Sequence, residues 1–99
     1  MEPLFQKSWK GQQSLEYDAT YALRKRKVRV RIKRDAYDFQ SYARAEVWYP
    51  KEMRWNQVAE VPYPMMESLK ASYYSRAEPG RWWSTDETRL LEEAAAILA

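Results

Sequence analysis

The stretch "LRKRKVRVRIKRDAYD", residues 23–38, decides which fold this chain can adopt. Three β-branched apolar residues, Val28, Val30 and Ile32, alternate there with basic residues. Because the side chains of a strand point alternately to its two faces, this spacing predicts a strand with one apolar face and one basic face. The basic face consists of every second residue: Lys25, Lys27, Arg29, Arg31 and Lys33.

The same two-residue period appears on both sides of this stretch. Residues 15–23 place their odd-numbered apolar side chains on one face, and residues 41–49 and 55–61 predict a third and a fourth strand. The apolar positions change from odd to even between Leu23 and Val28, which predicts either a β-bulge or a tight bend.

The C-terminal part has helical spacing instead. Residues 65–77 predict a short helix, and Ser84 with Glu87 three positions later has the pattern of a capping box. Strands followed by helices indicate an α+β fold, here an antiparallel sheet of three or four strands with one or two helices and the C-terminal helix packed on one face. The predicted core consists of Tyr17, Tyr21, Val28, Val30, Ile32, Val47, Leu90, Leu91, Ile97 and Leu98.

The length of 99 residues fits one small domain. Residues 1–13 show no periodicity, so we expect an N-terminal arm there, either flexible or held by Phe5 and Trp9. Residues 14–99 are then expected to form a single α+β domain.

Charge is distributed unevenly along the chain. The segment 24–34 contains eight basic residues, whereas the whole chain has a net charge of only +3, so the remainder carries a net −5. A basic strand beside aromatic residues is typical of surfaces that bind nucleic acid, DNA or RNA, because cations contact phosphates and aromatic rings stack on bases. The predicted nucleic-acid-binding residues are Lys25, Lys27, Arg29, Arg31, Lys33, Tyr42 and Trp48.

A competing interpretation treats the basic row as an ordinary solvated face of the sheet. Cross-strand pairs of opposite charge are common in antiparallel sheets. The acidic residues of the flanking strands stand at positions that could neutralise the row: Glu16, Asp18, Glu46 and Glu60.

The residue types present argue against catalysis. The chain has no Cys and no His, which excludes disulfides, thiolate chemistry and zinc sites built from those ligands, and removes the usual base that activates a serine. Two glycines cannot make a glycine-rich phosphate loop. Asp35 and Asp38 flank a predicted turn, where aspartates usually bond to the local backbone. We therefore expect a non-enzymatic protein without a cofactor, a catalytic residue or a metal site.

A protein partner is the alternative function. Residues 61–74 gather Met and Tyr side chains around two prolines, a composition found in adaptable interfaces. Tyr63 and Tyr74 lie off the expected core stripe and are the predicted interface residues. Under this interpretation the basic row steers the protein towards an acidic partner. A third interpretation is self-association, as a homodimer or a virion component.

The segment "RVRIKRDAYDFQSYARAEVWYP", residues 29–50, resembles short proteins encoded by bacteriophages of actinobacteria. The resemblance rests on a basic strand followed by an aromatic-rich hairpin and covers about a third of the chain. It implies an accessory phage protein that acts in the host cytoplasm, for which the alternative function becomes inhibition of a host protein. No apolar run is long enough to span a bilayer, so we expect a cytoplasmic protein without a membrane partner.

Overall fold

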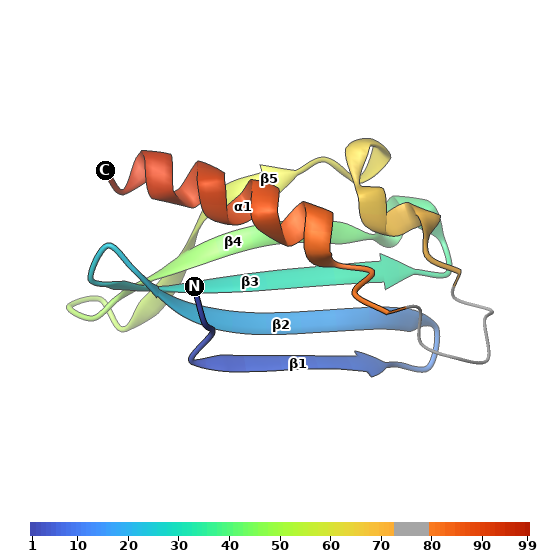
Figure 1. Ribbon diagram of the computed structural model, residues 1–99, viewed down its shortest axis with the longest axis horizontal. Helices are drawn as coiled ribbons and strands as arrows, with labels where there is room; N and C mark the ends of the chain where they lie inside the picture. The colour runs from blue at the N-terminus through green and yellow to red at the C-terminus, as the bar shows by residue number, and fades with distance from the viewer. Residues whose placement is uncertain (73–79) are drawn as a thin grey trace.

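The computed structural model describes residues 1–72 and 80–99. It shows a five-stranded antiparallel sheet in which the strands follow one another in chain order (Figure 1). The strands are β1 (Phe5–Lys10), β2 (Ser14–Leu23), β3 (Arg26–Asp35), β4 (Tyr42–Tyr49) and β5 (Arg54–Val61). The remaining elements of the described residues are three 3₁₀ helices, η1 (Asp38–Gln40), η2 (Tyr63–Met65) and η3 (Glu67–Lys70), and one α-helix, α1 (Ser84–Ile97).

The predicted α+β class is confirmed, with one correction to the number of strands. The helix α1 lies across one face of the sheet, as expected, but the sheet has five strands rather than three or four (Figure 1). The additional strand is β1, which comes from the segment predicted to be an arm. It pairs antiparallel with β2, so that Lys7 lies opposite Asp18 and Trp9 opposite Glu16.

A two-residue turn at Arg24 and Lys25 accounts for the shift of the apolar positions. Both residues have positive φ, 50° and 65°, which is the requirement of a type I′ hairpin turn. The turn separates β2 from β3 and brings Tyr21 opposite Val28. Of the two predicted alternatives, the tight bend is therefore correct. Arg and Lys are unusual here, because the left-handed conformation favours Gly or Asn.

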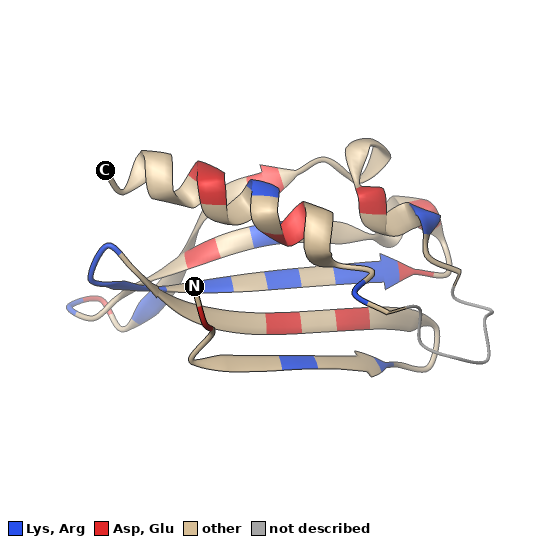
Figure 2. Cartoon of the chain, in the orientation of Figure 1, with Lys and Arg blue, Asp and Glu red and all other residues tan. Residues whose placement is uncertain are grey.

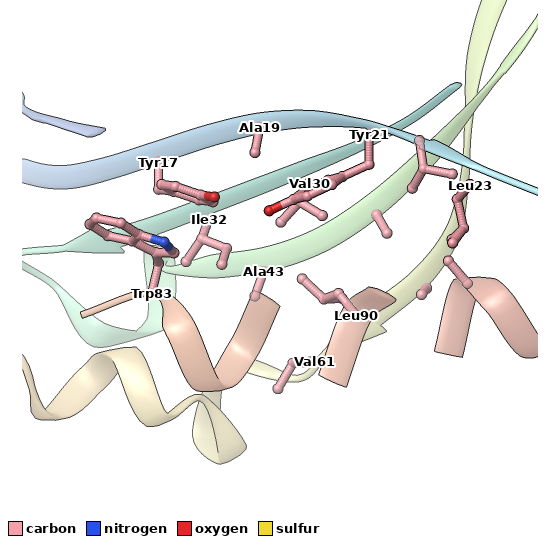
Figure 3. Packing of buried hydrophobic residues seen from close by; sticks show 14 of the residues in the cluster. Tyr17, Ala19, Tyr21, Leu23, Val30, Ile32, Ala43, Val61, Trp83 and Leu90 are labelled. Atoms are coloured by element: carbon pink, nitrogen blue, oxygen red, sulfur yellow. The ribbon is translucent and has the colours of Figure 1, made fainter. Parts of the chain in front are cut away.

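The core lies between α1 and the face of the sheet that α1 covers (Figure 3). Trp83 stacks on Tyr17 with ring centroids 4.5 Å apart and an interplanar angle of 11°. Leu90 of α1 is fully buried against the sheet. Most predicted core residues are confirmed as buried: Tyr17, Tyr21, Val28, Val30, Ile32, Val47 and Leu90.

Three predicted core residues at the solvent side of α1 are less buried. Leu91 and Leu98 are partly buried at the edge of the core. Ile97 is 55% exposed, so its assignment to the core is wrong. It lies in the last turn of α1 and does not pack against the hydrophobic core.

The predicted capping box does not form. The helix begins at Ser84, and its N-cap residue Trp83 makes no side-chain capping bond. Glu87 instead turns its carboxylate into the core, where it accepts a hydrogen bond from the hydroxyl of Tyr17. Burial raises the pKa of Tyr17, and the bond to Glu87 raises it further, so the phenol keeps its proton and remains a donor.

A second buried carboxylate joins α1 to η3. Asp86 is fully buried and accepts hydrogen bonds from the backbone N–H groups of Glu67, at 3.0 Å, and Ser68, at 2.9 Å. The hydroxyl of Ser68 donates to the same carboxylate. These bonds satisfy the free N–H groups at the start of η3. Of the short helix predicted over 65–77, the described residues form only the end of η2 and the 3₁₀ helix η3, and its remaining residues, 73–77, lie outside the described residues.

Candidate nucleic-acid interface

The outer face of the sheet is the face that points away from α1. Strand alternation places on it the side chains of β3 and β4 that do not enter the core. The predicted site residues on this face come from two neighbouring strands: Lys27, Arg29, Arg31, Lys33, Tyr42 and Trp48. The structure therefore brings these six together, while the seventh, Lys25, lies in the β2–β3 turn.

Three of the five cations in the row are already paired with acids. Arg29 contacts Glu46 at 2.9 Å, Arg31 contacts Asp18 at 3.4 Å, and Lys33 contacts Asp35 at 3.9 Å. In Figure 2 the blue bands of β3 lie beside the red bands of β2. The row is therefore partly neutralised, as in the competing interpretation: the hairpin registers place Asp18 opposite Arg31 and Glu46 opposite Arg29, and the partner of Lys33 lies two residues later on β3.

Unpaired cations gather instead at one end of the sheet, which we call the hairpin end. It comprises residues 24–27, the β2–β3 turn with its flanking residues, and residues 50–54, the β4–β5 turn with the first residue of β5 (Figures 1 and 2). Arg26 joins the two hairpins, since its guanidinium donates to the carbonyl of Trp48 at 3.3 Å and lies 4.9 Å from the ring centre of Tyr49.

The hairpin end concentrates the charge of the molecule. Arg24, Lys25, Lys27 and Lys51 make no ion pair within the described part of the chain, whereas Arg54 pairs with Glu52. Its net charge is +5, against +3 for the whole chain, and its charged residues are Arg24, Lys25, Arg26, Lys27, Lys51, Glu52 and Arg54.

Two tryptophans form an aromatic platform beside Lys27. Trp48 and Trp55 lie directly opposite each other on β4 and β5, with ring centroids 5.4 Å apart and an interplanar angle of 56°. Together with Lys27 they line a hollow of about 230 Å³. A planar ring can stack on this platform while the ammonium group of Lys27 contacts an anionic substituent. This is the arrangement through which single-stranded nucleic acid is commonly bound.

Trp55 was not among the predicted site residues, for a structural reason. By simple alternation it would share a face with Ala59 and Val61, which are buried. A bulge in β5, opposite the Ala45–Glu46 step, shifts the register by one residue and brings Trp55 to the outer face. In the sequence, the short polar stretch between Trp55 and Ala59 was the only feature that indicated this shift of register.

The far part of the outer face also pairs cations with aromatic rings. The guanidinium of Arg44 lies 4.4 Å from the ring centre of Tyr42, and the ammonium of Lys7 lies 5.0 Å from that of Trp9. Such contacts orient the cation without neutralising it. Aromatic rings and cations therefore alternate along much of the outer face.

The predicted protein interface is described only in part. Tyr63 is exposed at 40% and lies in η2, which contacts η1. Phe39 of η1 and Tyr37, which immediately precedes η1, are also exposed, and their ring centroids lie 6.2 Å apart. The second predicted residue, Tyr74, lies outside the described residues.

Residues 1–72 and 80–99 hold no cluster of three or more acidic side chains that could bind a metal ion. Across the same ranges, no helix has the length and apolar character needed to cross a membrane.

Comparison with family models, with curated proteins and with solved structures finds no match to this chain. The resemblance to phage-encoded proteins stays a prediction.

Proposed function

We propose that this protein binds single-stranded nucleic acid through the hairpin end and does so without catalysis. Bases stack on Trp48 and Trp55, and phosphates contact the cations around them. Lys25 and Lys27, both among the predicted residues, act here together with Arg24 and Lys51. We propose a cytoplasmic location for this activity.

The Trp48–Trp55 platform beside Lys27 is the observation that carries the proposal. The face of each ring, tilted by 56° to its neighbour, offers stacking to a base, and the ammonium of Lys27 offers a phosphate contact at the same place. The β2–β3 turn supports it further. Arg24 and Lys25 occupy two turn positions where the backbone favours Asn and Gly. Placing two positively charged side chains at this turn therefore lowers the stability of the fold.

Binding should depend strongly on salt and weakly on sequence. With contacts from the four unpaired cations, we expect the logarithm of the affinity for an oligothymidylate to fall against log salt with a slope of about −3, since each phosphate contributes about −0.7. Fluorescence anisotropy at several salt concentrations measures this slope. An affinity that ignores salt, or no binding at low salt, contradicts the proposal.

The substitution Lys25→Gly should separate stability from binding. Glycine adopts φ near +65° freely, so we expect the free energy of unfolding to rise by about 1 kcal/mol. The affinity for the oligonucleotide should fall several-fold, and the salt slope should become shallower by about 0.7, because one phosphate contact is lost. Thermal unfolding and anisotropy measure the two effects.

Met53→Gly is the matched control for this experiment. Met53 lies in the adjacent β4–β5 turn with φ of 51° and is exposed, so glycine relieves the same strain without changing the charge. We expect greater stability and unchanged affinity. If Lys25→Gly behaves like Met53→Gly, the cation at the turn has no part in binding.

A protein partner is the second candidate, favoured by one further observation. The elements η1 and η2 are in contact. Large apolar side chains are exposed on them and at the start of η1: Tyr37, Phe39, Tyr63 and Met65. Aromatic and Met side chains are enriched at interfaces. A partner that stays bound after nuclease treatment, and is lost on Phe39→Ala, would support this function. Light scattering tests the homodimer interpretation separately.

A further inference from the structure

Two arginines face each other in the middle of the outer face. Arg31 of β3 lies directly opposite Arg44 of β4 in the register. Side chains at such positions start only about 4.5–5.5 Å apart, and like charges there destabilise a sheet. The pair therefore opposes the stability of the isolated protein.

The neighbours of the two arginines do not balance their charge. Arg31 shares the carboxylate of Asp18, at 3.4 Å, and Asp18 also lies opposite Lys7 of β1. Arg44 lies opposite Glu60 of β5 but forms no ion pair with it or with any other acid in the described residues. The row across the five strands thus holds three cations and two carboxylates.

The Nε donors of both guanidinium groups are also without a hydrogen bond. The Nε atoms of Arg31 and Arg44 are shielded from solvent and make no hydrogen bond within the described part of the chain, although the Nε of Arg31 lies 3.4 Å from the carboxylate of Asp18. Shielded donors without a partner are rare in folded proteins and call for an explanation. Arg44 is held over the ring of Tyr42, so its plane is already oriented for a ligand.

A phosphate group would resolve all three features. Its oxygens accept from planar guanidinium groups with good geometry, and its charge neutralises the pair. We infer that Arg31 and Arg44 form a second phosphate site, which holds a phosphodiester of the same strand whose bases stack on Trp48; this inference rests on the proposed function. Arg44 precedes Trp48 by four residues on the same face, about 13 Å along β4, so one strand can reach both sites.

Arginine side-chain NMR tests the site directly. We expect the Nε–Hε signals of Arg31 and Arg44 to shift on addition of an oligothymidylate of about eight nucleotides, a length within the usual site sizes. Inorganic phosphate, titrated separately, should shift the same two signals. With inorganic phosphate the signal of Arg29 should move less, because its Nε already donates to Glu46 at 2.9 Å. Oligonucleotide binding that leaves Arg31 and Arg44 unshifted overturns the inference.

A variant of Arg44 gives an independent readout. Arg44→Gln should weaken oligonucleotide binding about fivefold and reduce the salt slope by about 0.7. The melting temperature should stay the same or rise, because the substitution removes a like-charge contact; a purely structural residue would lower it. Arg89→Gln on α1 is the control, since Arg89 is exposed on the opposite side of the sheet and donates to the carbonyl of Met65. Equal affinities for Arg44→Gln and the unchanged protein overturn the inference.

The experiment separates this inference from the proposed function. If the oligonucleotide shifts no signal at the hairpin end, the proposed function is wrong. Shifts of Arg31 and Arg44 caused by inorganic phosphate would then still support an anion site, with its phosphate from another source. If neither probe moves these two signals, the site itself is overturned.

Discussion

Trp48→Ala should lower the affinity for a single-stranded oligonucleotide about tenfold or more. Stacking of a base on an aromatic side chain contributes about 1–3 kcal/mol, and this substitution removes half of the Trp48–Trp55 platform. We expect the salt slope to stay the same, because no phosphate contact is lost. Fluorescence anisotropy measures both quantities, and Trp55→Ala should have a similar effect.

Two controls keep this result interpretable. Trp48→Leu keeps an apolar side chain on β4 but lacks a π face, so it should preserve folding and still lose affinity. Tyr37→Ala removes an exposed aromatic residue near η1, far along the chain from the platform, and should leave affinity unchanged. If Trp48→Leu binds as tightly as the unchanged protein, stacking does not drive the interaction.

Asp86→Ala should destabilise the fold by about 2–4 kcal/mol. The substitution removes the carboxylate that accepts three hydrogen bonds, and it leaves the buried N–H group of Ser68 and the partly buried N–H group of Glu67 without their acceptor. For a domain of this size the melting temperature should fall by more than about 10 °C. Thermal unfolding followed by circular dichroism measures the change.

The matched control replaces an acid elsewhere on the same helix. Glu93 is exposed on α1, so Glu93→Ala should change the free energy of unfolding by less than about 0.5 kcal/mol. Asp86→Asn should also be destabilising, because its amide group would direct a donor at the donors of η3. A melting temperature within a few degrees for Asp86→Ala would contradict the structural role assigned to this carboxylate.

Alternation predicted the strands wherever one of their faces is apolar. Strands β2, β3 and β4 each place an apolar row under α1, so their sequences alternate clearly. β1 was missed because neither of its faces is apolar. Its residues Phe5, Lys7 and Trp9 share one face with mixed chemistry, and the strand is held by the ladder to β2 and by a hydrogen bond from the Gln6 amide to the hydroxyl of Tyr17 at 2.9 Å.

Sequence predicted the face of the site but not its charge balance. Parity alone placed Lys27, Arg29 and Trp48 on a common surface. The ion pairs, the opposition of Arg31 and Arg44, and the platform partner of Trp48 depend on the registers between strands, which are set by turn geometry and by the β5 bulge. The capping box failed for a related reason, since tertiary burial drew Glu87 towards Tyr17.

The meander order of the sheet has a consequence for how the chain folds. Every strand pairs with its neighbour in sequence, so the sheet can assemble hairpin by hairpin and never has to close a long loop first. Proteins rich in such local pairings fold rapidly for their size. The docking of α1 is the step that joins distant parts of the chain, and we expect the bond between Asp86 and η3 to form after the transition state, where its loss accelerates unfolding rather than slowing folding.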